Sequence, residues 1–82
     1  MARKWNLHWS SGVTTPCTVY DESFKWSTPN EGDKSHTKQK TKHDLNDVEE
    51  FLVISPHNGL LKISETIDGN ELKIYECGKK IY

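Results

Sequence analysis

The sequence of 82 residues is poor in several residue types, and each shortage excludes a class of protein. Two cysteines, Cys17 and Cys77, are too few for a disulfide framework. We interpret them as reduced thiols, with a single bridge that closes a loop of about 60 residues as the alternative. The cysteines and the four histidines stand at least seven residues apart, without the paired spacing of zinc motifs. The five glycines are isolated rather than clustered in a phosphate-binding loop, so neither a metal nor a cofactor is predicted.

Long apolar runs and an excess of one charge are also missing. The longest apolar run, residues 51–54, is far too short to cross a bilayer. The basic N-terminus is not followed by an apolar stretch, which argues against a secretory signal. With 11 basic and 12 acidic residues, the net charge of -1 offers no general attraction to nucleic acid or to a membrane. We therefore expect a soluble, cytoplasmic protein without a membrane partner, and a processed secreted protein is the alternative.

Side chains with catalytic chemistry lack a local signature. Cys17 or Cys77 could meet His8 or His57 only through folding, and no motif supports such a pair. The adjacent carboxylates of residues 49–50 lie where acidic residues stabilise the start of a helix. No catalytic residue is predicted, and we do not expect an enzyme.

Hydrophobic alternation is the clearest pattern in the N-terminal part of the chain. Trp5, Leu7 and Trp9 alternate with polar residues, and this period of two predicts a half-buried strand. Two further stretches rich in β-forming residues, 17–20 and 24–26, predict either one hairpin or two short strands. A turn or bulge between these stretches would explain why the parity of their large residues changes.

The C-terminal third of the chain predicts a β-meander. Residues 51–55 are expected to form a strand that ends in a turn at Gly59. Residues 60–67 and 71–77 predict the next two strands, since the Asp-Gly-Asn turn at residues 68–70 separates them. The last residues could add a third short hairpin. The apolar residues expected on the inner faces of these strands are Leu61, Ile63, Ile67, Leu72 and Ile74.

A polar stretch separates these two halves. Residues 27–44 contain no apolar side chain, so burial cannot offset the entropy of ordering them, and we predict a long flexible loop. Residues 34–43 carry four lysines and no acid, whereas residues 44–50 carry four acids and no base. Asp44 is a good N-cap, and the acids after it fit the start of a helix of at most two turns.

These patterns together predict one small domain over residues 1–82 that is mainly β. We expect a small antiparallel β sandwich or open barrel of about five strands. It would include a C-terminal β-meander, the long polar loop and an optional short helix. Only 17 side chains are Val, Ile, Leu or Phe, so the three tryptophans and three tyrosines are needed to complete a core.

The first functional hypothesis is a non-catalytic module that binds a larger protein, as an inhibitor or an adaptor. Tryptophan is a preferred anchor at protein interfaces when it is exposed. A sheet edge, such as the strand that contains Trp5, could also pair with a strand of the partner. The candidate protein-binding residues are Trp5, Trp9 and Trp26.

The alternative hypothesis is a weak binder of single-stranded nucleic acid. Lysines contact phosphates without reading the sequence, and a tyrosine on a basic sheet face can stack on a base. The near-neutral charge argues against this alternative, and the sequence leaves the oligomeric state open. The candidate residues for it are Lys34, Lys38, Lys40, Lys42, Lys62, Lys73 and Tyr75.

Overall fold

The protein is described by a computed structural model that covers residues 3–31, 34–41, 44–54 and 59–77. Six strands, one 3-10 helix and one α-helix make up this part of the chain. In chain order, the elements are β1 (Arg3–Trp9), β2 (Thr14–Val19), β3 (Ser23–Trp26), η1 (Pro29–Glu31), β4 (His36–Gln39), α1 (Asp47–Ile54), β5 (Leu60–Ile67) and β6 (Asn70–Glu76).

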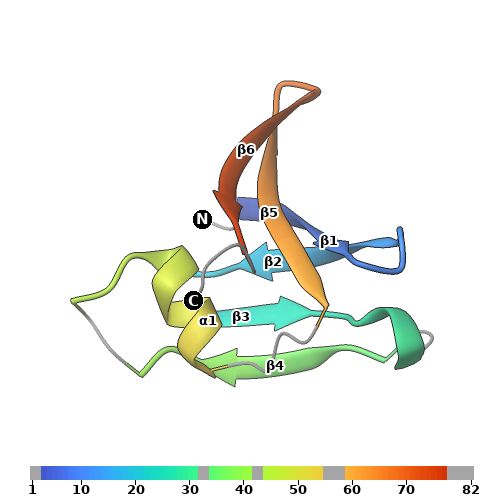
Figure 1. Ribbon diagram of the computed structural model, residues 1–82. Helices are drawn as coiled ribbons and strands as arrows, with labels where there is room; N and C mark the ends of the chain where they lie inside the picture. The colour runs from blue at the N-terminus through green and yellow to red at the C-terminus, as the bar shows by residue number, and fades with distance from the viewer. Residues whose placement is uncertain (1–2, 32–33, 42–43, 55–58, 78–82) are drawn as a thin grey trace.

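The six strands form a single antiparallel sheet in the order β4-β3-β2-β1-β5-β6. The first four strands follow one another as a meander, and β5 then joins the free side of β1. The β5–β6 hairpin rises steeply from the plane of the meander, so the sheet is strongly bent (Figure 1). The prediction of a small, mainly β fold is confirmed. Instead of the expected sandwich or open barrel of about five strands, the six described strands form one open sheet with a short helix on its inner face.

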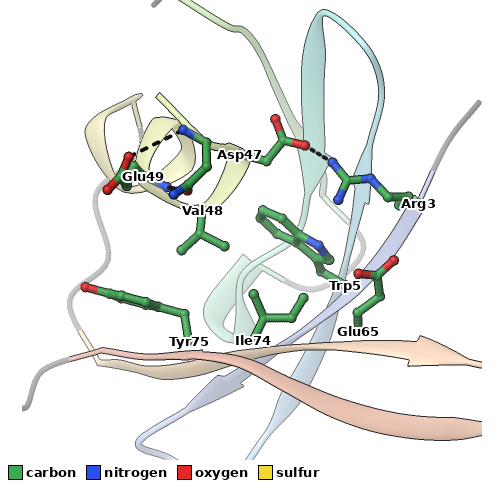
Figure 2. A pocket seen from close by; sticks show the side chains of 9 residues that line it. Arg3, Trp5, Asp47, Val48, Glu49, Glu65, Ile74 and Tyr75 are labelled. Carbon is green, nitrogen blue, oxygen red and sulfur yellow. Dashed lines mark hydrogen bonds and ion pairs between the residues drawn. The ribbon is translucent and has the colours of Figure 1, made fainter. Parts of the chain in front are cut away.

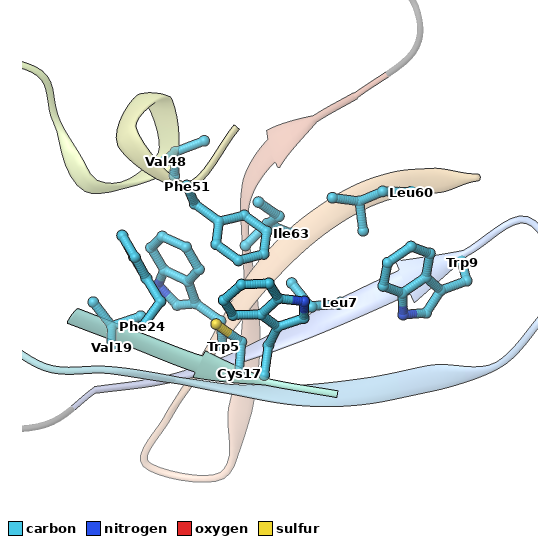
Figure 3. Close-up of a cluster of buried hydrophobic side chains, with 11 residues drawn as sticks. Trp5, Leu7, Trp9, Cys17, Val19, Phe24, Val48, Phe51, Leu60 and Ile63 are labelled. Atoms are coloured by element: carbon cyan, nitrogen blue, oxygen red, sulfur yellow. The ribbon is translucent and has the colours of Figure 1, made fainter. Parts of the chain in front are cut away.

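The N-terminal alternation builds the inner face of the sheet as predicted. Trp5, Leu7 and Trp9 are buried on β1, and their polar neighbours face the other side. Val19 and Phe24 are cross-strand partners in the β2–β3 hairpin, so the turn between them brings both onto the inner face. Figure 3 shows Trp5, Val19 and Phe24 beneath the helix, and Trp9 at the far end of the cluster.

Helix α1 covers this inner face through Phe51, which is 1% exposed. The ring of Phe51 packs edge-on against Trp5, Phe24 and Trp26, with centroids 6.0, 5.4 and 5.2 Å away. Such edge-to-face contacts add specific orientation to the area that the rings bury. The aromatic cluster therefore determines where the helix sits on the sheet.

The prediction of a strand at residues 51–55 was wrong for residues 51–54, because these continue the helix. The N-cap of the helix is Asn46 rather than the predicted Asp44, and the helix starts at Asp47. The Asn46 side-chain oxygen accepts a hydrogen bond from the Glu49 amide at 2.9 Å, and the Glu49 carboxylate accepts one from the Asn46 amide at 3.4 Å. This reciprocal cap begins a helix that a four-residue apolar run can continue. The predicted turn before Gly59 lies outside the described residues.

Polar contacts hold the start and the middle of α1 against the sheet. Asp47 forms ion pairs with Arg3 on β1 and, at 2.7 Å, with Lys40 just after β4. The buried carboxylate of Glu50 accepts hydrogen bonds from the Thr41 amide and hydroxyl, at 2.6 and 2.9 Å. These contacts join two acids of the helix to Lys40 and Thr41 of the segment that precedes it.

The long-loop prediction for residues 27–44 is corrected where the structure has η1 and β4. Strand β4 pairs with β3, from Ser23 opposite Gln39 to Trp26 opposite His36. An edge strand needs backbone pairing more than apolar side chains, and polar residues on an edge limit unwanted association. Composition alone therefore failed to reveal this strand.

The β5–β6 hairpin has the predicted turn. Asp68 and Gly69 both have positive φ angles, 52° and 82°, and Ile67 pairs with Asn70 across a two-residue loop. Two positive φ angles define a type I′ turn, whose twist suits a tight hairpin. A predicted third hairpin after Cys77 lies outside the described residues.

The predicted inner face of this hairpin was wrong in part. Ile63 is buried, whereas the other four apolar residues are 36–49% exposed. The register shifts between His8 and Trp9 opposite β5, and between Ile63 and Ser64 opposite β6. Each shift inserts one extra residue and breaks the alternation on which the prediction relied. The four exposed residues are Leu61, Ile67, Leu72 and Ile74.

Replacing Phe51 by alanine tests the role of the aromatic cluster. The variant leaves a cavity between three rings, so we expect the free energy of unfolding to fall by about 3–5 kcal/mol. Val53→Ala is the control on the same helix, since Val53 is 59% exposed, and it should cost less than about 0.5 kcal/mol. Urea denaturation measures both, and equal losses would contradict the proposed packing of α1.

Candidate functional site

The predicted tryptophan anchors are not surface residues. Trp5, Trp9 and Trp26 are 1%, 7% and 5% exposed. The strand that contains Trp5 lies between β2 and β5, so it is not an edge. The prediction of these residues as exposed anchors is therefore corrected: with so few other large apolar residues, the core consumes all three rings.

The predicted nucleic-acid residues do not form one surface. Lys62 and Lys73 project from the outer face of the β5–β6 hairpin, because they pair with His8 and Ser64. Tyr75 pairs with the buried Ile63 and lies on the inner face. The bulge at Ile63 and Ser64 causes this separation, which simple alternation misses.

The lysine-rich segment lies along the opposite edge of the sheet. Lys34 and Lys38 are exposed there, and Lys42 lies outside the described residues. The Lys40 side chain is mostly buried, with its Nζ 5.0 Å from the centroid of the Phe24 ring and 2.7 Å from Asp47. Burial, then the charge of Arg3, lowers the pKa of Lys40. Lys40 therefore has a structural partner in the fold.

The most unusual surface in the described structure is strand β6. It stands at one edge of the sheet, and each of its seven residues is exposed. Leu72, Ile74 and Tyr75 lie within it, at 49%, 36% and 40% exposure. An edge strand that also carries exposed apolar side chains is a natural template for a partner strand.

A pocket of about 600 Å³ opens beside this strand, between β6, β5, β1 and the start of α1. Its volume is within the range of ligand-binding sites. Figure 2 shows Ile74 and Tyr75 on its floor, with Val48 above them and Arg3 and Glu65 at one side. The complete lining is Arg3, Trp5, Asn46, Asp47, Val48, Glu49, Glu65, Ile74 and Tyr75.

The charges in this pocket are only partly neutralised. Asp47 pairs with Arg3, whereas the carboxylates of Glu49 and Glu65 form no ion pair with any described residue. Trp5, the cross-strand neighbour of Glu65, has a buried indole Nε1 that finds no hydrogen-bond acceptor in the described part of the chain. A buried donor that lacks an acceptor costs about 1–3 kcal/mol, so native proteins rarely leave one.

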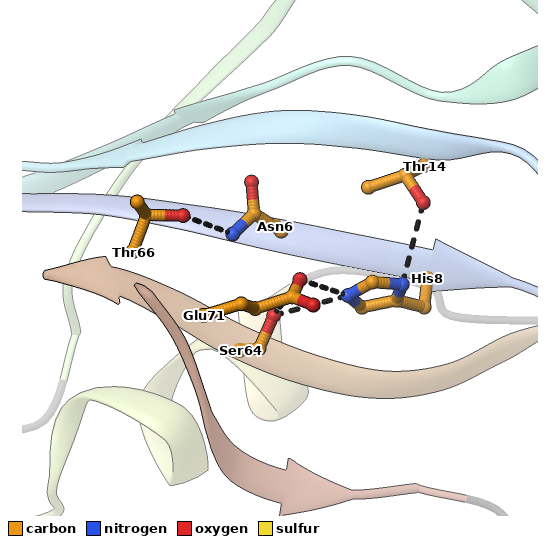
Figure 4. A network of polar contacts seen from close by, with 6 residues as sticks. All are labelled: Asn6, His8, Thr14, Ser64, Thr66 and Glu71. Carbon is orange, nitrogen blue, oxygen red and sulfur yellow. Dashed lines mark hydrogen bonds and ion pairs between the residues drawn. The ribbon is translucent and has the colours of Figure 1, made fainter. Parts of the chain in front are cut away.

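A separate polar network lies on the outer face of the sheet (Figure 4). The His8 Nε2 atom lies 2.7 Å from the Glu71 carboxylate and 3.0 Å from the Ser64 hydroxyl. Ser64 also donates to Glu71, and Thr14 contacts the other ring nitrogen of His8 at 3.3 Å. These contacts join β1, β5 and β6.

This network contains the residue types of a hydrolytic triad in a different geometry. A triad needs an Nε2 that accepts the serine proton and an acid on Nδ1. Here the acid contacts Nε2, and Ser64 is 1% exposed with its proton donated to Glu71. The arrangement therefore holds the β5–β6 hairpin against β1.

The two cysteines are free thiols. Burial raises the pKa of Cys17 to about 12 and also raises that of Cys77. A nucleophilic cysteine needs the opposite shift, because the thiolate is the reactive form. The thiols therefore behave as part of the core, where Cys77 packs at its margin.

Comparisons with protein-family models, with curated proteins and with solved structures gave no match. Within the described residues, no three His, Cys, Asp or Glu side chains converge as metal ligands. The described part of the chain also has no helix of the length and hydrophobicity needed to span a membrane. The edge at β6 and the pocket beside it are therefore the candidate functional site.

Sequence reasoning named Tyr75 only for the nucleic-acid alternative, and it did not name Glu65, Leu72 or Ile74 as site residues. Leu72 and Ile74 were assigned to a buried face because their spacing is that of a strand. One signal in the sequence pointed to an exposed edge. Charged residues Glu71, Lys73 and Glu76 interrupt this strand, as is common where self-pairing must be limited.

Replacing Glu71 by glutamine tests the outer network through pH. Hydrogen bonds from Ser64 and His8 lower the pKa of Glu71 below its ordinary value of 4.5. The ionised carboxylate therefore stabilises the fold above that value, and this contribution is lost as the pH falls through the lower folded-state pKa. Between about pH 6 and pH 3, the melting temperature should fall less steeply in E71Q than in the wild type. Glu22→Gln, on the β2–β3 turn, should keep the wild-type slope, and a wild-type slope in E71Q would contradict the network.

Thiol labelling tests the burial of the cysteines. At about pH 8, a free thiol reacts readily, whereas a thiol with a raised pKa holds little thiolate. Iodoacetamide should leave Cys17 unmodified in the native protein and label Cys77 more slowly than in the urea-unfolded chain. Mass spectrometry of the peptides measures both sites. In the Cys77→Ala variant, Cys17 is the single thiol. Rapid labelling of Cys17 in the native state of this variant would contradict its burial in the core.

Proposed function

We propose that this protein is a non-catalytic module that binds a larger protein along the edge of β6. The observation that carries the proposal is the exposure of Leu72, Ile74 and Tyr75 on an edge strand whose only partner among the described strands is β5. Backbone groups of such a strand hydrogen-bond an added strand, and the alternate side chains supply specificity. Binding there would either cover a surface of the partner or bring it to a third molecule, as an inhibitor or an adaptor does.

The neighbouring hairpin surface supports the same proposal. Leu61 and Ile67 on β5 are also exposed, at 49% and 44%. Apolar side chains gathered on one hairpin suggest an interaction site more strongly than single ones scattered over a surface. The His8–Glu71 contact ties this hairpin to β1, so a partner would meet a pre-ordered edge.

The opposite edge of the sheet is a weaker candidate. Strand β4 reads His-Thr-Lys-Gln and offers no exposed apolar side chain. The nucleic-acid alternative has no single observation in its favour, because Tyr75 and the lysines lie on different faces or edges.

Replacing Leu72 by lysine tests the β6 edge. Immobilised wild-type protein should capture a partner from lysate of the cells that make it. The purified partner should then bind L72K at least about tenfold more weakly than it binds the wild type, since an apolar contact is lost. Val53→Lys is the matched control, because it removes an exposed apolar side chain from α1, away from β6. Equal affinity for L72K and the wild type would contradict binding along β6. Concentration-dependent dimerisation abolished by L72K would instead identify a second copy as the occupant.

A further inference from the structure

We propose that the pocket beside β6 binds an arginine side chain of the protein partner. This inference rests on the proposed function, since it assigns the chemistry of one residue in the strand that pairs with β6. It concerns the pocket that Trp5, Glu49, Glu65 and Tyr75 line (Figure 2).

The charged side chains that line the pocket favour a cation. The lining holds three carboxylates, those of Asp47, Glu49 and Glu65, against the single cation of Arg3. Arg3 is already paired with Asp47, and Lys40 approaches the same carboxylate from outside the pocket. Of the other two carboxylates, that of Glu49 caps the helix through the Asn46 amide, and that of Glu65 forms no ion pair with any described residue, so the Glu65 side of the pocket is a site for a cation.

The indole Nε1 of Trp5 is buried, has no hydrogen-bond partner among the described residues and faces the side of the pocket where Glu65 lies. Trp5 and Glu65 are direct cross-strand partners. A cation in the pocket would hold the Glu65 carboxylate inward against its attraction to water. The second oxygen of that carboxylate would then be available to the indole N–H. One bound cation thus completes two unsatisfied groups.

The combination of carboxylates and an aromatic ring in the pocket favours arginine over other cations. A guanidinium is planar, donates several hydrogen bonds to carboxylates and stacks on aromatic rings, and Tyr75 provides a ring in this pocket. Neighbouring strands are about 4.8 Å apart, so a strand added to β6 would lie about 10 Å from β5. An arginine side chain on that strand and the Glu65 side chain on β5 can together span this distance.

A second copy of this chain is a poor source of the bound arginine. Arg3 is its only arginine, and it is engaged with Asp47. Symmetric antiparallel pairing of two β6 strands about their centre would also set Lys73 against Lys73. Like charges directly opposite one another destabilise a strand pair. The arginine must therefore come from a different protein.

The test uses the full chain and two capped amino acids that differ in charge. N-acetyl-arginine methylamide is titrated against the protein, with the neutral isostere N-acetyl-citrulline methylamide as the matched probe. We expect the arginine probe to shift the Trp5 indole N–H signal in proton–nitrogen NMR spectra and to bind at least about tenfold more tightly than citrulline, because a charge-assisted contact is lost. Binding should weaken between low salt and about 0.3 M salt.

Glu65→Gln should weaken the arginine probe about tenfold, whereas Glu22→Gln should leave its affinity unchanged. The salt dependence in the wild type decides the question if E65Q fails to fold. Equal affinity for arginine and citrulline, or an unmoved Trp5 signal, would overturn the inference. Because the probes cannot pair as strands, that result leaves the effect of L72K on the partner untouched, and the two proposals fail separately.

Discussion

The packing of Phe51 onto three aromatic rings of the sheet is the contact on which the rest of this structure depends. The chain has few large aliphatic residues, so the tryptophans and phenylalanines must supply the core. Four of these rings meet at α1: Trp5 comes from β1, Phe24 and Trp26 come from β3, and Phe51 comes from the helix itself. A bent sheet with one helix across its inner face is a way to bring them together without a second sheet.

The polar residues around that core position the helix rather than merely solubilise it. Asp47 receives Arg3 from one strand and Lys40 from the end of another, while Glu50 binds Thr41 from inside the core. A buried carboxylate is unfavourable unless hydrogen bonds satisfy it, so these contacts specify one orientation of α1. The start of the helix is thereby held over Trp5, and the pocket arises where the helix stops short of the β5–β6 hairpin.

The β5–β6 hairpin has the opposite character. It leans away from the helix, its outer face is held by the His8–Ser64–Glu71 network, and its inner face keeps apolar residues exposed beside an acidic pocket. Rigid support on one face with unsatisfied groups on the other is an arrangement suited to binding. The functional proposal follows from this asymmetry of the hairpin, since the edge at β4 is polar and short.

Local physics made part of this fold predictable from the sequence. The alternation of Trp5, Leu7 and Trp9 requires only that one face of a strand be buried, and the turn at Asp68 and Gly69 requires only residues that tolerate positive φ. Both predictions depend on neighbours in the chain. Balanced charge and the dispersed cysteines and histidines were equally visible without a structure.

Only the tertiary structure decided which residues are exposed and which lie side by side. Residues 51–54 are helical because a cap precedes them and aromatic rings receive Phe51, and a run of four apolar residues has no periodicity that could reveal this. Strand β6 became an edge because β5 joined β1, which is more than fifty residues away in the chain. The candidate site therefore escaped prediction: long-range pairing and two bulges, rather than local pattern, placed Glu65 beside Trp5 and Tyr75 on the inner face.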